Sequence, residues 1–262
     1  MASITSGDEL GPDGRLHMPS PVPNVVNGIA PTYSIADLRV VRHGQSAANV
    51  AFADPTTAAM PLPGRDADIG LSARGHEQAV ALGKWLAGLD EFERPQLVVC
   101  SPYLRAQQTW TVMARTAESS NAGAGCMRTV IDERVRDREM GVFELYPPTA
   151  IQSSAPEEAR RRAQIGDWYY RPPGGESLAD LCLRVRDVLN ELDRTAETSR
   201  VLIISHDAVA AATRHVLAGI GAPPPTDLAA VTNGSISRWQ SNRQHLHVMQ
   251  WSDTSHLQEV MP

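Results

Sequence analysis

The chain has few cysteines and no long apolar run. Its three cysteines are an odd number, and none are spaced like metal ligands, so the sequence predicts free thiols in a reducing, cytoplasmic setting and no metal site. No run of about 18 apolar residues occurs, so no membrane-spanning helix is predicted. The first ten residues have neither a basic start nor an apolar segment, so no secretory signal is expected.

Positive charge is also in short supply. The chain has 24 Lys and Arg against 30 Asp and Glu, which gives a net charge of −6 with neutral histidine. This balance argues against nucleic acid or an anionic membrane as the main partner. An anionic small molecule would need cations gathered in one local pocket.

The composition is that of an ordinary globular protein, with 42% hydrophobic and 21% charged residues in 262. Residues 1–35 are rich in Pro, Gly, Ser and Asn and predict an irregular N-terminal arm. Residues 36–262 are long enough for one large domain.

Short apolar runs alternate with helical patterns along this domain. We predict strands at 38–41, 97–100, 129–131 and 201–204, and a closing hairpin of 235–240 with 245–251. Helices are predicted over 73–89, from 104 to about 117, over 156–164, from 178 to about 196, and from 207 to about 219. Prolines after Asn49 predict a loop up to Gly64. The alternation predicts an α/β fold, a three-layer α/β/α sandwich with a mostly parallel central sheet.

Cations and imidazoles stand where three of these strands end. Arg42 and His43 follow the first strand, Arg105 lies just past the second, and His206 follows the apolar run 201–204. Ligands of open α/β sheets bind at the carboxyl ends of strands, and arginine pairs well with phosphate oxygens. A lone arginine or histidine here is often structural, but the threefold recurrence of the placement favours one phosphate-handling site.

A catalytic acid is harder to place. Seven of the ten residues 132–141 are charged, which is typical of an exposed loop with ion pairs but also offers carboxyl groups. The aromatic run 168–170 is interpreted first as a cluster packed inside the protein, and a wall that faces the substrate is the alternative. Specificity is expected from loops 50–70 and 140–175.

The chain resembles the histidine phosphatase superfamily, also called phosphoglycerate mutase-like, from about Asp37 to Trp251. The resemblance rests on motifs in the order of that family: Arg42-His43-Gly44-Gln45-Ser46 with Asn49; Asp68, Leu71-Ser72, Gly75 and Gln78-Ala79; Ser101-Pro102, Leu104-Arg105-Ala106 and Thr109; Gly174-Gly175-Glu176-Ser177; and Ser205-His206. Together these motifs are specific, whereas each alone is not.

The resemblance implies a metal-independent phosphomonoesterase that needs no cofactor and acts on a small phosphorylated metabolite. His43 would attack phosphorus and form a phosphohistidine, with Arg42, Arg105 and His206 holding the phosphoryl oxygens. Ser46 and Asn49 would add neutral hydrogen bonds to the phosphoryl group. Cationic neighbours should keep His43 neutral by lowering its pKa.

The acid is where this chain departs from the family pattern. Many members carry Glu four residues before the glycine of this loop, and counting back from Gly141 gives Asp137, which we predict as the acid. Glu133, Glu139 and Asp207 are competitors, the last because an acid-phosphatase branch uses a His-Asp pair.

Two other functions remain open at this point. Mutases of the family usually place Glu-Trp where Ala47-Ala48 stand here, which favours hydrolysis over phosphoglycerate mutation. Some members are non-catalytic binding modules, but this chain keeps the core groups. The sequence does not identify the substrate or the oligomeric state.

Overall fold

The computed structural model describes residues 29–54, 60–195, 200–225 and 230–258. In these residues six strands form one sheet in the order β3-β2-β4-β1-β5-β6. The strands are β1 Asp37–Arg42, β2 Leu97–Cys100, β3 Arg128–Ile131, β4 Arg200–Ser205, β5 Ile236–Ser241 and β6 Leu246–Asp253. The first four run parallel, and the hairpin of β5 and β6 adds two antiparallel strands.

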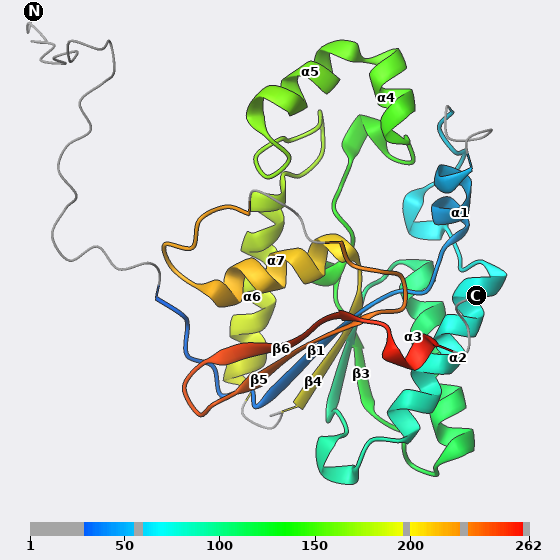
Figure 1. Cartoon of the computed structure of the whole chain (residues 1–262), viewed down its shortest axis with the longest axis vertical. Coiled ribbons are helices and arrows are strands. Elements are labelled where there is room, and N and C mark those ends of the chain that lie inside the picture. Colours follow the sequence, from blue (N-terminus) through cyan, green and yellow to red (C-terminus); the bar gives the residue numbers. More distant parts are fainter. Residues whose placement is uncertain (1–28, 55–59, 196–199, 226–229, 259–262) are drawn as a thin grey trace, which may run out of the picture.

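Helices cover both faces of the sheet, as the sequence predicts (Figure 1). The helices are α1 Ala47–Ala53, α2 Ala73–Ala87, α3 Leu104–Ser120, α4 Pro148–Ser154, α5 Pro156–Ile165, α6 Leu178–Arg194 and α7 Asp207–Ala218. Side chains alternate between the faces of a strand, so the core has two parts. Val40 and Ile203 pack with α6 and α7, whereas Val41 and Ile204 pack with α2 and α3. The three-layer prediction is confirmed.

Two short helices were not predicted. The loop predicted to begin after Asn49 begins later, because residues up to Ala53 belong to α1. This helix starts where Ser46 and Asn49 form a reciprocal capping box. Residues 148–154 form α4, which lies beside α5. The first residue of α4 is Pro148, and proline is favoured at the first position of a helix. In Figure 1, α4 and α5 stand away from the sheet at the top of the molecule.

The described part of the N-terminal arm lies against the domain. Ile29 exchanges backbone hydrogen bonds with Ile220, and Ile35 is fully buried in the same core part as α6. Residues 1–28 of the predicted arm lie outside the described residues. Among the helices described, none is both long and apolar enough to cross a membrane. Cys100, Cys126 and Cys182 are free thiols.

Candidate active site

The carboxyl ends of β1, β2 and β4 meet because these strands are neighbours in a parallel sheet. The backbone N–H of His43 donates to Ser205 O at 2.9 Å, and that of Ser101 donates to Ile204 O at 2.9 Å. The residues that follow the three strands are thereby brought to one place. Their convergence agrees with the sequence prediction, which required only strand order and direction.

His43 is buried, and its two ring nitrogens have different partners. Nδ1 lies 2.7 Å from Gly44 O, so Nδ1 carries the proton and the lone pair is on Nε2. The Nε–H of Arg105 points at this Nε2 from 3.1 Å. Burial first, and then the charges of His206, Arg105 and Arg42, hold the pKa of His43 well below its ordinary value. The ring is therefore neutral near neutral pH, with Nε2 as the atom able to attack an electrophile.

Arg105 is the centre of the polar contacts. Besides Nε2 of His43, its guanidinium donates to both carboxylate oxygens of Asp66, at 2.9 and 3.0 Å, and to Oδ2 of Asp137 at 2.8 Å. The ring of Tyr103 lies under the guanidinium, 4.8 Å away. The side chain is 5% exposed, so every one of these contacts is made in a largely desolvated place.

The side chains of His206 and Arg42 complete the group. Nδ1 of His206 lies 3.2 Å from Oδ2 of Asp137, and its Nε2 lies 2.9 Å from Ser101 Oγ. The rings of His43 and His206 are 5.1 Å apart at their centroids. Arg42 reaches Asp207 at 3.2 Å, while its buried Nε has no hydrogen-bond partner among the described residues. An oxyanion is a natural acceptor for such a donor.

The four carboxyl groups considered as the acid occupy different places. Glu133 is exposed, and the Glu139 carboxylate pairs with Arg136, so neither reaches His43. Asp137 and Asp207 both line a cavity of about 320 Å³. Burial would raise the pKa of Asp137, but the charges of His206 and Arg105 outweigh it and hold the pKa well below the usual range. Asp137 is thus a carboxylate in the ligand-free protein.

Asp66 is a site residue that the sequence reasoning missed. It begins a 3-10 turn, Asp66–Asp68, lines the same cavity and holds Arg105 with both oxygens. Burial raises its pKa, although Arg105 opposes the shift. The motif comparison pointed to Asp68, two residues on, and nothing local in the sequence distinguishes Asp66.

Close backbone packing fixes the His43 loop. A side chain on Gly44 would put its Cβ 2.4 Å from Gly75 O, and one on Gly75 would lie 2.0 Å from Gln45 O. Gln78 accepts from the Gln45 backbone at 2.8 Å, and Thr109 accepts from Gly44 at 3.1 Å. Gly75 and Gln78 of α2 and Thr109 of α3 therefore all hold the His43 loop, although they are distant from it in the sequence.

Ser46 and Asn49 lie beside this loop as the cap of α1. Oδ1 of Asn49 accepts from the backbone N–H and the hydroxyl of Ser46, both at 3.0 Å, and from Asn233 at 3.1 Å. These contacts use Oδ1 of Asn49, so its Nδ2 amide group is the donor that can bind an oxyanion.

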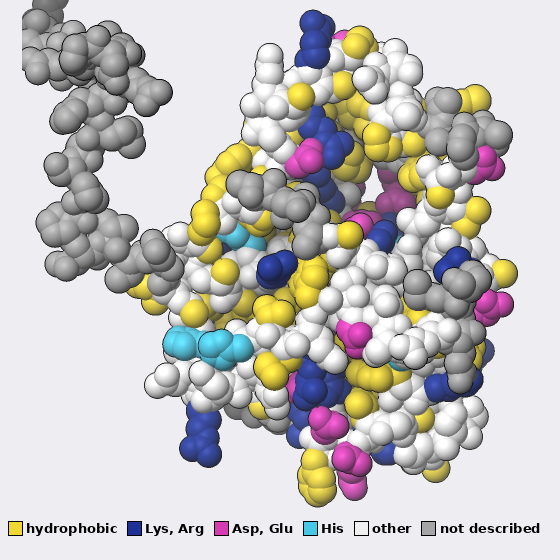
Figure 2. All heavy atoms as spheres, in the orientation of Figure 1, with side chains coloured by type: hydrophobic (Ala, Val, Ile, Leu, Met, Phe, Trp, Pro, Cys, Tyr) yellow, Lys and Arg dark blue, Asp and Glu magenta, His cyan; other side chains and the backbone are white. Residues whose placement is uncertain are grey.

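The loop that carries Asp137 is held by a partly buried ion-pair network. Arg184 donates to the backbone carbonyls of residues 134, 136 and 137 at 2.7–2.9 Å and to the Glu176 carboxylate. Glu176 also accepts from the backbone of Glu139 at 3.1 Å. The Gly174–Ser177 motif thus acts by positioning the acid loop. Figure 2 shows acidic and basic side chains in the hollow between the α4–α5 part and the body.

The aromatic run does not line this cavity. Trp168 and Tyr170 are buried, with Trp168 against His215 and the Tyr170 hydroxyl donating to Glu158. Only Tyr169 is exposed. Trp168 and Tyr170 are therefore packed inside the protein, as the first of the two interpretations predicted. Within the described ranges no group of three or more His, Cys, Asp or Glu is arranged to hold a metal ion.

Comparison with known proteins agrees with this geometry. Residues 38–254 match the profile of the "Histidine phosphatase superfamily (branch 1)". A relative in Erwinia tasmaniensis, named probable phosphoglycerate mutase GpmB, is 30% identical over 227 residues, 84% of this chain and 94% of that protein.

Two solved structures share the fold. YhfR of Bacillus stearothermophilus has a TM-score of 0.65 at 22% identity, with 85% of this chain and 99% of that chain covered. A mycobacterial glucosyl-3-phosphoglycerate phosphatase has a TM-score of 0.63 at 22% identity, with 84% and 100% covered. With 217 consecutive positions matched to one profile, and with His43, Arg105 and His206 meeting at the strand ends, the chain belongs to the histidine phosphatase superfamily.

Proposed function

We propose that this protein hydrolyses phosphomonoesters of small organic molecules through a phosphohistidine on His43. The observation that carries the proposal is the state of His43: Nδ1 is tied to Gly44 O while Nε2 faces the guanidinium of Arg105 at 3.1 Å. A neutral nucleophile surrounded by cations suits attack on a dianionic phosphoryl group.

In the first step Nε2 of His43 forms a bond to phosphorus as the bond from phosphorus to the alcohol oxygen breaks. Arg42, Arg105 and His206 hold the phosphoryl oxygens, and the Asn49 amide adds a neutral hydrogen bond. The N–H and the hydroxyl of Ser46 both donate to Asn49 Oδ1, so Ser46 supports the helix cap and does not bind phosphate. Asp137 takes up a proton from solvent as the phosphoryl dianion binds, gives that proton to the leaving oxygen, and then takes one from the water that cleaves the phosphorus–nitrogen bond. The phosphoryl charge offsets the cations that keep the pKa of Asp137 low in the free protein, so the pKa rises when substrate binds.

Asp137 and Asp207 can be separated on a substrate with a poor leaving group. We expect Asp137→Asn to lower kcat about 10²-fold or more, because the alcohol then leaves without a proton, and Asp207→Asn to lower it less than about tenfold. Steady-state phosphate release at saturating substrate measures both. A substrate with a good leaving group is the internal control, since the two variants should differ little on it. Full turnover by Asp137→Asn on the poor leaving group would refute the assignment.

Asp66 should compete with phosphate for Arg105. The Asp66 carboxylate occupies two guanidinium donors in the ligand-free protein. Asp66→Asn removes the competing charge, and we expect the inhibition constant of inorganic phosphate to fall about tenfold. Asp68→Asn, in the same turn, is the matched control and should leave that constant unchanged. Weaker phosphate inhibition of Asp66→Asn would mean that Asp66 orients Arg105 for phosphate.

A mutase activity is the alternative, in view of the names carried by the GpmB relatives. Ala47 and Ala48 open α1 and offer only methyl groups at the positions where mutases usually have Glu-Trp. An assay on 3-phosphoglycerate separates the reactions: phosphate release without isomerisation supports hydrolysis, whereas efficient isomerisation with little phosphate release refutes it.

A further inference from the structure

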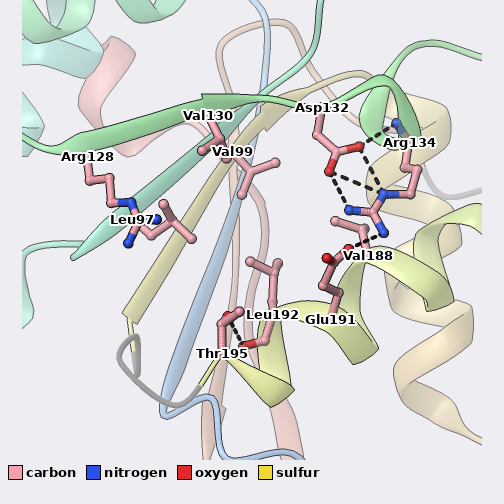
Figure 3. Close-up of a pocket in the computed structure, with 10 residues that line it drawn as sticks. All are labelled: Leu97, Val99, Arg128, Val130, Asp132, Arg134, Val188, Glu191, Leu192 and Thr195. Carbon is pink, nitrogen blue, oxygen red and sulfur yellow. Dashed lines mark hydrogen bonds and ion pairs between the residues drawn. The ribbon is translucent and has the colours of Figure 1, made fainter.

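Two polar regions of the molecule differ in whether their hydrogen bonds are complete. In a groove of about 620 Å³ between the sheet and α6, Arg134 donates to Asp132 and pairs with Glu191, so these charges neutralise one another (Figure 3). At the candidate active site, by contrast, the amide nitrogen of Asn49 has no hydrogen-bond partner within the described part of the chain. The orientation of this amide decides whether it presents a donor or an acceptor to a phosphoryl oxygen.

The contacts of Asn49 Oδ1 fix that orientation. The backbone N–H and the hydroxyl of Ser46 both donate to Oδ1 at 3.0 Å, and Nδ2 of Asn233 donates to it at 3.1 Å. A backbone N–H can only donate, so the atom that faces Ser46 has to be the oxygen of the amide. The Nδ2 group of Asn49 is then left to point away from the helix cap.

The orientation of Asn233 is fixed in the same way by a second backbone group. Its Nδ2 lies 3.3 Å from the carbonyl oxygen of His43. A carbonyl can only accept, so this atom has to be the nitrogen, and its second hydrogen is directed to Asn49 Oδ1. Asn233 therefore joins the backbone of the nucleophile to the amide of Asn49, although it lies far from both in the sequence.

The loop that carries Asn233 is held without its side chain. The backbone N–H of Gly234 donates to the carbonyls of His43 and Arg42, at 3.0 and 3.1 Å. The backbone N–H of Arg42 donates in turn to Ser235 O at 3.1 Å. Removal of the Asn233 amide thus leaves the His43 carbonyl with a donor, and the contact that is lost without replacement is the one to Asn49 Oδ1.

We propose that Asn233 is a positioning residue of the phosphoryl site, which holds the Asn49 amide so that its Nδ2 group is ready to donate to a phosphoryl oxygen. The inference rests on the phosphate-binding role of Asn49 in the proposed function. A donor that is fixed before the ligand arrives needs no reorganisation when negative charge builds up on the phosphoryl oxygens. Without Asn233, only the donors of Ser46 hold Oδ1, and the amide is less well fixed.

Calorimetric titration of the full chain with inorganic phosphate tests the coupling of the two residues. We expect Asn49→Ala to raise the dissociation constant about tenfold and Asn233→Ala about fivefold, as for the loss of one neutral hydrogen bond. In the double variant, Asn233→Ala should add less than about twofold to the effect of Asn49→Ala, because Asn233 acts through the Asn49 amide. Effects that multiply, or an unchanged dissociation constant for Asn233→Ala, would overturn the proposal.

Thr232→Ala is the control for Asn233→Ala. Thr232 is the exposed neighbour in the same loop, and its hydrogen bonds among the described residues are made by its backbone. This variant should change neither the dissociation constant of phosphate nor the thermal midpoint. The thermal midpoint of every variant shows whether it is folded, and we expect Asn233→Ala to stay folded because Gly234 still holds the loop.

A measurement on wild type keeps the test decisive if a variant misfolds. In a proton–nitrogen correlation spectrum, the Nδ2 signals of Asn49 should shift when phosphate saturates the protein, whereas those of Asn233 should shift little, because both of its hydrogens keep their partners. Asn49 signals that stay in place would overturn the inference.

The result also separates this inference from the proposed function. A protein that binds phosphate with the expected coupling but releases none from any monoester would refute hydrolysis and leave the role of Asn233 intact. Hydrolysis combined with multiplying effects would do the reverse. A wild type that does not bind phosphate would overturn both.

Discussion

Replacement of His43 by alanine should lower kcat by about four orders of magnitude or more, because the variant loses the Nε2 lone pair that faces Arg105 and forms the bond to phosphorus. The variant keeps Arg42, Arg105 and His206, so phosphate should still bind. Loss of turnover with retained binding is the expected combination. Phosphate release and inhibition by inorganic phosphate measure the two separately.

The same variant tests the covalent intermediate. Brief exposure of wild type to substrate, followed by a denaturing quench, should leave acid-labile phosphate on the chain, and His43→Ala should carry none. His247→Ala, an exposed histidine on β6, is the matched control and should retain both turnover and labelling. Turnover by His43→Ala near the wild-type rate would refute the role of His43, and an unlabelled, inactive wild type would favour a binding module.

Replacement of Arg105 by lysine should be the second largest effect. A lysine keeps one positive charge, but a single ammonium cannot at once face His43, Asp66 and Asp137 as the planar guanidinium does. We expect kcat/KM to fall about 10²- to 10³-fold, because the transition state loses a fixed pair of donors. Steady-state kinetics on the best substrate measures this loss.

Arg115→Lys is the control for Arg105→Lys, since Arg115 lies on the exposed side of α3. It should change neither kcat/KM nor the thermal midpoint. Arg105→Lys should also lower the thermal midpoint, because two partly buried carboxylates lose charge-assisted hydrogen bonds. An Arg105→Lys variant with wild-type kcat/KM would mean that the arginine serves the fold alone.

Most of the sheet was predictable from local pattern. The runs 97–100 and 201–204 are short and apolar on both faces, as strands buried between two helical layers must be, and the run 38–41 is apolar except for Arg39. Each run forms a strand within two residues of its predicted ends. The helix predicted to begin at 178 does begin there, because Ser177 and Asp180 form a reciprocal capping box at the start of α6. α1 was missed because its signal, the box of Ser46 and Asn49, lies within the motif that was read for chemistry alone.

The site was predictable in part. Residues that directly follow strands of a parallel sheet must lie at one edge, so the gathering of His43 and His206 needed no knowledge of loop conformation. Arg105 joins them from the first turn of α3, which begins a few residues after β2 ends. The carboxyl groups come from loops. Which of them faces Arg105 depends on contacts between segments far apart in the chain, such as the hold of Arg184 on the backbone of the acid loop.

The sequence by itself determined that cations and imidazoles stand at the ends of neighbouring strands, because hydrophobic periodicity sets the strands and parallel pairing aligns their ends. Only the tertiary structure decided that Asp66 joins Asp137 on Arg105 and that Glu139 turns away to Arg136. Long-range hydrogen bonds, such as those from Leu62 to Leu145 and from Asp66 to Glu144, fix the loop of Asp66.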